Sequence, residues 1–248
     1  MSRIGIIDWG IGGISIYKLI KERMPGVPVT YFSDTGETPY GKMDRYELSS
    51  RLNTVIPFLK KRGVTHVVIG CNAASTAVDD LKDNGVPIFG VIHPAVRMTA
   101  RMRPSELGLI GGRRTVVSGV HRRGLAEHGI SVRQRIAQPL SALIESGDVS
   151  SDVIHAEARR IIAPLRGCSH ILLACTHYPA ILPVLRHHAP RVKFLDPAEE
   201  LVSVLKHERL TRSSGRDEFL TTGSTGGMKR AAKNAFGAKI QTATRVSL

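Results

Sequence analysis

Gly70-Cys71-Asn72-Ala73-Ala74-Ser75 and Ala174-Cys175-Thr176-His177-Tyr178 are the two stretches that decide the fold of this 248-residue chain. Each follows an apolar run that is typical of a buried parallel strand, Val67-Val68-Ile69 in one case and Ile171-Leu172-Leu173 in the other. In open α/β sheets, ligands collect beyond the carboxyl ends of the strands. Two thiols at equivalent points of two half-chains therefore predict one cleft with a cysteine on each wall. Such a pair suits reversible proton transfer at carbon, because one thiolate can remove a proton while the opposing thiol delivers another.

The rest of the chain alternates between strand and helix patterns. Apolar runs predict strands over residues 3–7, 27–32, 65–69, 87–92, 107–110, 130–136, 169–173, 192–195, 217–222 and 239–242. Periodic stretches predict helices over residues 14–23, 43–62, 74–82, 116–128, 139–145, 151–165, 179–187, 199–206 and 225–236. His93-Pro94 is predicted to be the crossing between two halves, since the α/β pattern restarts after it.

These patterns predict an α/β protein with two similar α/β domains, whose mainly parallel sheets face each other across a cleft. The first domain is predicted to comprise residues 1–94 plus 207–248, and the second residues 95–206. The tail beyond a polar connection at 207–216 is too small for a core of its own, so we expect it to complete the first domain.

Composition and cysteine usage exclude several classes of protein. With 42% hydrophobic and 23% charged residues, the chain is typical of a globular protein. No apolar run approaches the roughly 20 residues that span a bilayer, and no signal-peptide pattern follows Met1, so we expect a cytoplasmic protein without a membrane partner. Three widely spaced cysteines predict reduced thiols rather than disulfides, and none has the spacing of a metal ligand pair. Cys168 lies in no motif and is expected to be structural.

The net charge of +14 permits attraction to nucleic acid or steering of an acidic substrate. The basic residues are dispersed and no aromatic residues are interleaved with them, so solvated helix faces explain them better and we do not expect nucleic acid as a partner. The glycine-rich turn Gly10-Ile11-Gly12-Gly13 lacks the third glycine of a dinucleotide fingerprint. It is better suited to a tight turn and the close approach of a small ligand.

Four motifs together resemble the aspartate/glutamate racemase family, over nearly the whole chain. They are Asp8-Trp9-Gly10-Ile11-Gly12-Gly13, Pro39-Tyr40-Gly41, Cys71-Asn72 and Cys175-Thr176-His177-Tyr178. The resemblance implies a racemase, closest to the glutamate-specific members, that acts at Cα of glutamate or a similar acidic amino acid without a cofactor. A homodimer is compatible with it.

The resemblance also implies catalytic roles. Cys71 corresponds to the base for the D-enantiomer and Cys175 to the base for the L-enantiomer. Asp8 would assist Cys71, His177 would assist Cys175, and Glu145 matches a further acidic residue near the second thiol. Each assisting residue has a structural alternative, because Asp8 could cap a helix, His177 could be a core histidine and Glu145 a solvated helix-end acid.

Substrate contacts follow from the same resemblance. Asn72 and Thr176 are expected to bind the α-carboxylate. The Pro39-Tyr40-Gly41 loop and Thr115 are expected at the distal carboxylate, and Arg113 or Arg114 could be a further carboxylate partner.

Three positions depart from the glutamate racemase pattern. Trp9 stands where a serine is usual, and Ala73 and Gly112 stand where threonines are usual. Trp9 and Ala73 are still expected to line the substrate site, where the indole would form an apolar wall. The lost hydroxyls leave two alternatives open: a family member with another substrate, such as aspartate, a hydantoin or maleate, or a low-activity binding protein on the same fold.

Overall fold

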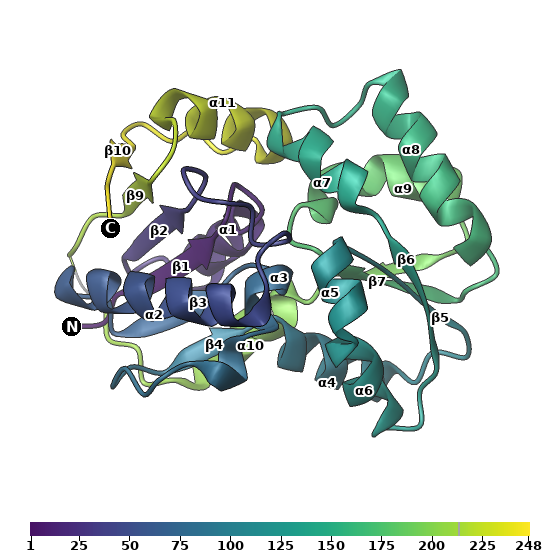
Figure 1. The fold of residues 1–248 in the computed structure, drawn as a ribbon, viewed down its shortest axis with the longest axis horizontal. Helices are drawn as coiled ribbons and strands as arrows, with labels where there is room; N and C mark the ends of the chain where they lie inside the picture. Colours follow the sequence, from purple (N-terminus) through teal and green to yellow (C-terminus); the bar gives the residue numbers. More distant parts are fainter. Residues whose placement is uncertain (213) are drawn as a thin grey trace.

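Two separate sheets, in both of which every paired strand is parallel, form the frame of the protein (Figure 1). The computed structural model describes residues 1–212 and 214–248. The first sheet has the order β10 (Thr244–Arg245), β9 (Glu218–Thr221), β2 (Val29–Ser33), β1 (Ile4–Asp8), β3 (His66–Ile69), β4 (Ile88–Gly90). The second has the order β6 (Val132–Ile136), β5 (Leu107–Gly111), β7 (His170–Ala174), β8 (Lys193–Leu195). The predicted fold class, two α/β units with parallel sheets, is confirmed.

Helices cover both faces of the first sheet because its strands bury side chains on both sides. Ile4 and Ile6 of β1 pack in one core with α1 (Ile14–Arg23), α10 (Ala198–His207) and α11 (Thr225–Phe236). Ile7, which points to the opposite face, packs in another core with α2 (Arg45–Lys61). The alternation follows from the two-residue period of a strand. In Figure 1 the yellow α11 lies above this sheet and α2 lies in front of it.

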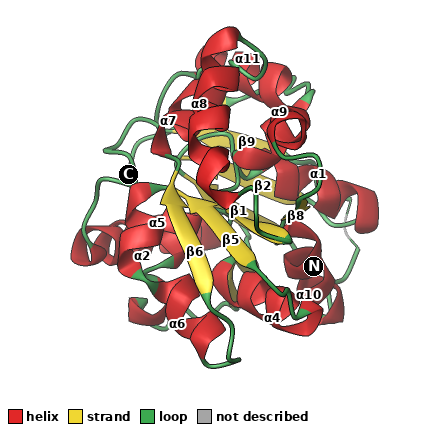
Figure 2. Ribbon diagram, turned by 90° about the vertical axis from the view of Figure 1, so that its right-hand side faces the viewer, coloured by secondary structure: helices red, strands yellow, loops and turns green. Residues whose placement is uncertain are grey.

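The second sheet is covered in the same way (Figure 2). Ile171 and Leu173 of β7 share a core with α7 (Gln138–Glu145), α8 (Asp152–Ile162) and α9 (Leu182–His188). Leu172 and Ala174 face the other side, where α4 (Ile92–Met102) and α6 (Val120–Ala126) complete the core. The remaining elements are α3 (Asn72–Ser75), α5 (Arg113–Ser118) and the 3₁₀ turns η1 (Val78–Asp80), η2 (Ala163–Leu165) and η3 (Tyr178–Ile181).

Both sheets reverse their strand order at one point. The chain goes from β1 outward to β2 and then returns to place β3 on the other side of β1; likewise β6 and β7 lie on opposite sides of β5. A crevice for ligands forms at such a switch point, beyond the carboxyl ends of the strands. The two predicted thiols follow β3 and β7, so each lies at the switch point of its own sheet.

Several predicted elements are wrong in detail. Residues 74–82 do not form a continuous helix but the short α3 followed by η1. His93-Pro94 lies in the first turn of α4, a helix that was not predicted and that connects β4 of the first sheet to β5 of the second. The predicted helix 116–128 is divided at Gly119, whose φ is +69°. The last strand is β10, not residues 239–242.

Residues 95–206 contain the whole second sheet, while both β9 and β10 of the tail join the first. The domain boundaries themselves stay a prediction, since α10 packs against both α1 and α4. None of the helices in the described residues combines the length and the apolar character that crossing a membrane requires.

Candidate active site

Asp8 ends β1 and is completely buried at the start of the glycine-rich turn. Its carboxylate accepts hydrogen bonds from the backbone N–H of Trp9 at 2.7 Å and of Gly13 at 2.6 Å. The hydroxyl of Thr176, from the other half of the chain, donates to Asp8 Oδ2 at 3.2 Å. Burial raises the pKa of Asp8, an effect that the nearby His177 opposes and Glu145 reinforces.

Cys71 follows β3 as the N-cap of α3 and is half-buried. Burial raises the pKa of its thiol well above the ordinary value, and the charge of Asp8 adds to this, while backbone N–H groups of the next turn act in the opposite direction. The charge of Cys175 also raises the Cys71 pKa, so the two sulfur atoms, one from each sheet, are close enough to interact electrostatically. Burial and the charge of Asp8 thus both favour the protonated form of the Cys71 thiol.

Asn72, directly after Cys71, is buried with 3% exposure. Its side-chain Oδ1 has no hydrogen-bond partner among the described residues. A buried amide group without a partner costs free energy, about 1–3 kcal/mol, unless a ligand or water satisfies it. The position and the open hydrogen-bonding capacity agree with a polar group being bound here.

Cys175, His177 and Glu145 form a chain of contacts on the second half of the molecule. Cys175 Sγ lies 3.6 Å from His177 Nδ1, and His177 Nε2 lies 2.7 Å from Glu145 Oε2. Burial alone would lower the pKa of His177, but its hydrogen bonds with Cys175 and Glu145 outweigh burial and raise this pKa well above the ordinary value. A proton on His177 is therefore held within reach of the Cys175 sulfur.

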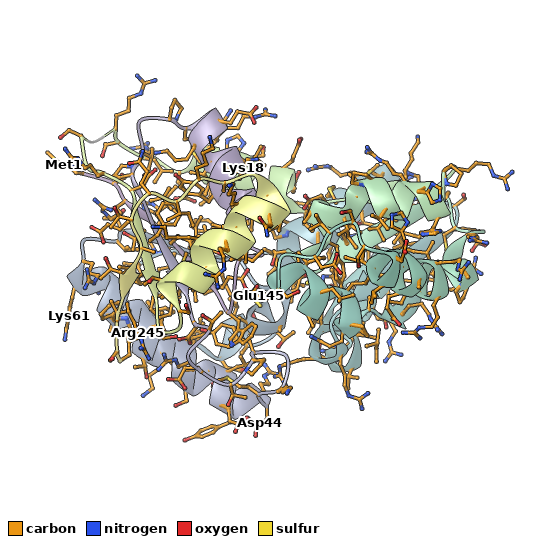
Figure 3. All side chains as sticks on the ribbon, turned by 90° about the horizontal axis from the view of Figure 1, so that it is seen from above. Met1, Lys18, Asp44, Lys61, Glu145 and Arg245 are labelled. Atoms are coloured by element: carbon orange, nitrogen blue, oxygen red, sulfur yellow. The ribbon has the colours of Figure 1, made fainter. Side chains whose placement is uncertain are left out.

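The glycine-rich turn of the first half presses directly on this chain. Ile11 N–H donates to Glu145 Oε2 at 2.9 Å. A Cβ atom at Gly10 would overlap the Glu145 carboxylate, and one at Gly12 would lie 2.6 Å from His177 Nδ1. A side chain at Gly10 would displace Glu145 and one at Gly12 would displace His177, which explains why glycines stand there. In Figure 3, Glu145 lies where the two halves of the ribbon meet.

The residues predicted to contact substrate lie in different surroundings. Tyr40 is buried, and its hydroxyl donates to Asp34 Oδ2 at 2.7 Å, so its side chain anchors the loop 39–41 to the protein interior. Pro39 and Gly41, on either side of it, are half-buried. The indole N–H of Trp9 donates to the Glu37 carbonyl at 2.9 Å.

Two further residues predicted to contact substrate are Ala73, shortly after Cys71, and Thr115, shortly after the glycine turn 111–112. Ala73 is half-buried beside Cys71, and Thr115 is buried in α5. Of the two candidate arginines, Arg114 reaches the first half, where its Nε donates to Thr76 Oγ1 at 3.2 Å. Burial lowers the pKa of Arg114.

Two residues near the site were not predicted from the sequence, Ser141 and Gln138 of α7. Ser141 Oγ lies 3.4 Å from both Cys175 Sγ and the Tyr178 hydroxyl. Gln138 Oε1 accepts a hydrogen bond from Arg113 N–H at 3.1 Å. Neither lies in a recognisable motif; only their spacing on one helix, four and seven residues before Glu145, could have indicated them.

Residues 4–205 match the family described as Asp/Glu/Hydantoin racemase. The chain belongs to this family. Its similarity to individual members extends over nearly the full length. A glutamate racemase from Thermus thermophilus is 33% identical over 256 residues, which cover 99% of this chain and 96% of that protein. A glutamate racemase from Bacillus cereus is 29% identical over 260 residues, covering 99% and 97%.

Solved structures of Asp/Glu/hydantoin racemase family members share the architecture. The glutamate racemase from Thermus thermophilus in complex with β-chloro-D-alanine matches with a TM-score of 0.86 at 28% identity, over 100% of this chain and 97% of that one. The glutamate racemase from Francisella tularensis in complex with D-glutamate matches in fold with a TM-score of 0.89, over 99% and 97% of the two chains, at 24% identity.

The arrangement in this family member can move protons at carbon. It offers a thiol near a buried carboxylate on one sheet, and a thiol paired with an imidazole and a carboxylate on the other. Among the described residues, the side chains that converge as a possible metal site are three histidines on α8 and α9, not residues of this junction. All five predicted catalytic residues lie at this junction or are linked to it by the contacts given above.

Proposed function

We propose that this protein is a cofactor-independent glutamate racemase that interconverts L- and D-glutamate by proton transfer at Cα. The observation that carries the proposal is the placement of two cysteines at the switch points of two separate sheets, whose edges are joined by the hydrogen bond from Thr176 to Asp8. Support comes from relatives named glutamate racemase that cover nearly the whole chain.

In the direction from L- to D-glutamate, the Cys175 thiolate removes the Cα proton and the electron pair of the C–H bond stays on carbon. The Cys71 thiol then delivers its proton to the opposite face, which leaves Cys175 protonated and Cys71 as thiolate. Proton exchange with His177 and with solvent restores the starting state. The reverse direction uses the same steps, so one thiol must be protonated and the other ionised in each productive complex.

The neighbours of the thiols supply the required protonation states. Asp8 and burial favour the protonated form of Cys71. On the other side, Glu145 stabilises a protonated His177 next to Cys175. With Cys71 protonated and a protonated His177 beside Cys175, the enzyme would be ready to bind the L-enantiomer, with Cys175 as the base.

Substrate binding is proposed to use the positions around the thiols. The unpartnered Oδ1 of Asn72 would accept a hydrogen bond from the substrate's ammonium group, and the Asn72 amide N–H and the backbone at Thr176 would donate to the α-carboxylate. The Thr176 hydroxyl itself donates to Asp8 in this structure, so it fixes the junction as well. Ala73, Thr115, Trp9 and the loop 39–41 would surround the rest of the substrate.

The test is incorporation of deuterium at Cα of L- and D-glutamate in heavy water, together with chiral chromatography of the products. We expect wild type to exchange and racemise both enantiomers, and the Cys71→Ala and Cys175→Ala variants to lose racemisation. The matched control is Cys168→Ala, since Cys168 is buried beside Leu165 and Gly108, away from the junction. Normal racemisation by either of the first two variants would contradict the two-thiol mechanism.

A related candidate is a family member with another substrate, because Trp9 stands at a position where a serine is usual. Its indole N–H donates to the Glu37 carbonyl, which fixes the ring beside the glycine-rich turn. Assaying aspartate, hydantoins and maleate beside glutamate decides between them: a higher kcat/KM for any of these would replace glutamate as the substrate. The cytoplasmic location, a homodimer and independence of a cofactor remain predictions.

A further inference from the structure

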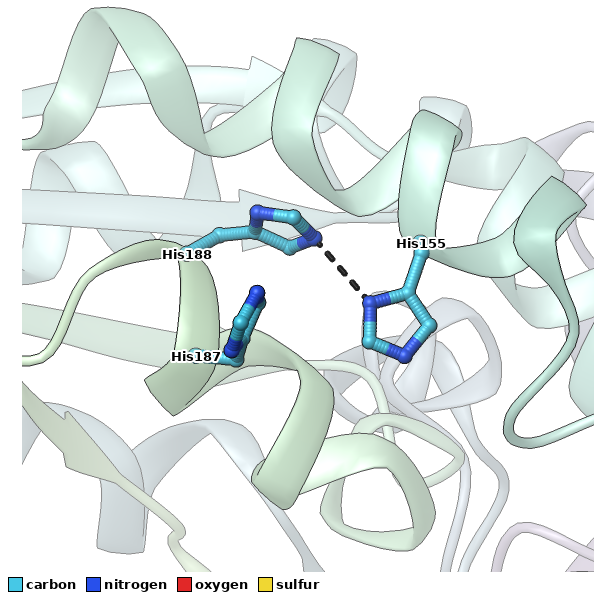
Figure 4. Close-up of side chains that lie close together, drawn as sticks. All are labelled: His155, His187 and His188. Atoms are coloured by element: carbon cyan, nitrogen blue, oxygen red, sulfur yellow. Dashed lines mark hydrogen bonds between the residues drawn. The ribbon is translucent and has the colours of Figure 1, made fainter.

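Three histidines converge on the side of the second sheet that α8 and α9 cover (Figure 4). His155 comes from α8, and His187 and His188 are the last two residues of α9. One ring nitrogen of each lies within 4.8 Å of the others. The three rings stand nearly perpendicular to one another, with centroids 4.9 to 5.6 Å apart.

The spacing of two of these rings fits tetrahedral metal coordination. His155 Nδ1 and His188 Nε2 are 3.3 Å apart. A zinc ion binds imidazole nitrogen at about 2.0–2.1 Å, so two nitrogens at a tetrahedral angle are about 3.3–3.4 Å apart. The same separation is long for an N–H···N hydrogen bond, which is usually near 2.9–3.0 Å.

The third ring can reach the same point. His187 is exposed, whereas His155 and His188 are half-buried. An exposed side chain changes rotamer at little cost, so a shift of about 1–1.5 Å can bring its nitrogen to the remaining 3.3 Å spacing. Two ligands are thus in place and the third is adjustable.

Two arginines lie beside the cluster. Arg166 Nε donates to the His188 carbonyl at 3.1 Å, and Arg159 is on α8 with His155. The same arginines favour a negatively charged group at a fourth coordination position.

We propose that His155, His187 and His188 bind one divalent transition-metal ion of the zinc class through three imidazole nitrogens. The fourth position is open to water or a small anion. The metal ties α8 to α9 and so stabilises the layer behind β7. It takes no part in proton transfer, because α9 runs away from Cys175 and carries the histidines at its far end. The inference is independent of the proposed racemase activity.

The test is calorimetric titration of Zn²⁺ into metal-free protein carrying Cys71→Ser and Cys175→Ser, so that thiols at the junction cannot bind the ion. We expect one site per chain. Adding His155→Ala or His187→Ala should each weaken binding at least roughly tenfold, since even indirect changes at metal sites have effects of that size. His207→Ala is the matched control, because His207 also ends a helix and is exposed, and it should leave the affinity unchanged.

Two further measurements separate a built site from scattered binding. Zn²⁺ should raise the melting temperature of the double-serine protein but not that of the same protein with His155→Ala. Co²⁺ in place of Zn²⁺ should give the visible absorption bands of a tetrahedral site. Absence of saturable binding in the double-serine protein overturns the proposal, as does an affinity of the His155→Ala and His187→Ala variants equal to that of the His207→Ala control.

Discussion

Replacing Gly10 by alanine should disable the proton-transfer site although it removes none of the site's own side chains. The new Cβ would lie 2.6 Å from Glu145 Oε1 and closer still to Oε2. Ordinary contacts begin near 3.4 Å, so the carboxylate must retreat by about 1 Å. That movement breaks the 2.7 Å contact with His177 and the 2.9 Å hydrogen bond from Ile11.

The expected loss follows from the size of this displacement. A misplacement of about 1 Å at a catalytic group costs roughly 10²-fold in rate. We therefore expect kcat/KM to fall about 100-fold, equivalent to about 2.7 kcal/mol of transition-state stabilisation. Because L- and D-glutamate are equal in free energy, kcat/KM must fall by the same factor in both directions.

The assay is glutamate racemisation followed by chiral chromatography, in a double-mutant cycle with Glu145→Ala. If the new methyl group acts by displacing Glu145, Gly10→Ala should have almost no further effect in the Glu145→Ala background. Gly167→Ala is the control, since a Cβ there would meet only Arg133 at 4.0 Å. An equal loss from Gly10→Ala in both backgrounds would refute the argument.

Two predictions concern stability, and both are measured by urea unfolding. His121 is fully buried with both ring nitrogens unpartnered among the described residues, and burial lowers its pKa to about 4. In the unfolded chain His121 binds a proton near pH 6.5, whereas in the folded protein it stays neutral down to about pH 4. The free energy of unfolding of wild type should therefore fall by about 2 kcal/mol between pH 7 and pH 5, a loss that His121→Leu does not share. A difference between the two proteins that stays constant over this pH range would contradict the prediction. Arg51 pairs with the buried Asp34 at 2.7 and 2.8 Å, so Arg51→Ala should cost about 3–5 kcal/mol, whereas Arg45→Ala, at the exposed pair with Asp80, should cost under about 1 kcal/mol. Similar losses from both arginine variants would show that burial of the Asp34 pair is unimportant.

The fold was predictable wherever the apolar pattern was strong. Each strand of both sheets except β10 overlaps a predicted strand, and the central strands β1, β5 and β7 were the clearest because strands covered on both faces give continuous apolar runs. The missed helix α4 shows where the pattern was misread. Pro94 lies in the first turn of α4, where backbone N–H groups have no partner within the helix, so a proline at this position does not terminate the helix.

The site was predictable in part for a similar reason. Residues that directly follow a strand, such as Asp8, Cys71 and Cys175, are placed by the sheet, and sheets are readable from sequence. Ser141 was missed because it reaches Cys175 only through the packing of α7, which no local pattern reveals. Tyr40 was predicted to face the substrate, yet its hydroxyl is turned to Asp34, since a buried carboxylate needs donors.

The side chain of Gln138 lies next to Gly112, the position where the sequence lacks a threonine hydroxyl. From sequence alone, Gly112 removes a hydrogen bond to a charged group, a loss of roughly 1.5–3 kcal/mol. In the structure a Cβ at Gly112 would lie 3.0 Å from Gln138 Oε1, and one at Gly41 would lie 3.4 Å from the same atom. The Gln138 amide thus occupies the space between the two turns proposed to hold the distal carboxylate, and an amide also carries two N–H donors. Gln138 can therefore offer hydrogen-bond donors at a turn where Gly112 has no side chain.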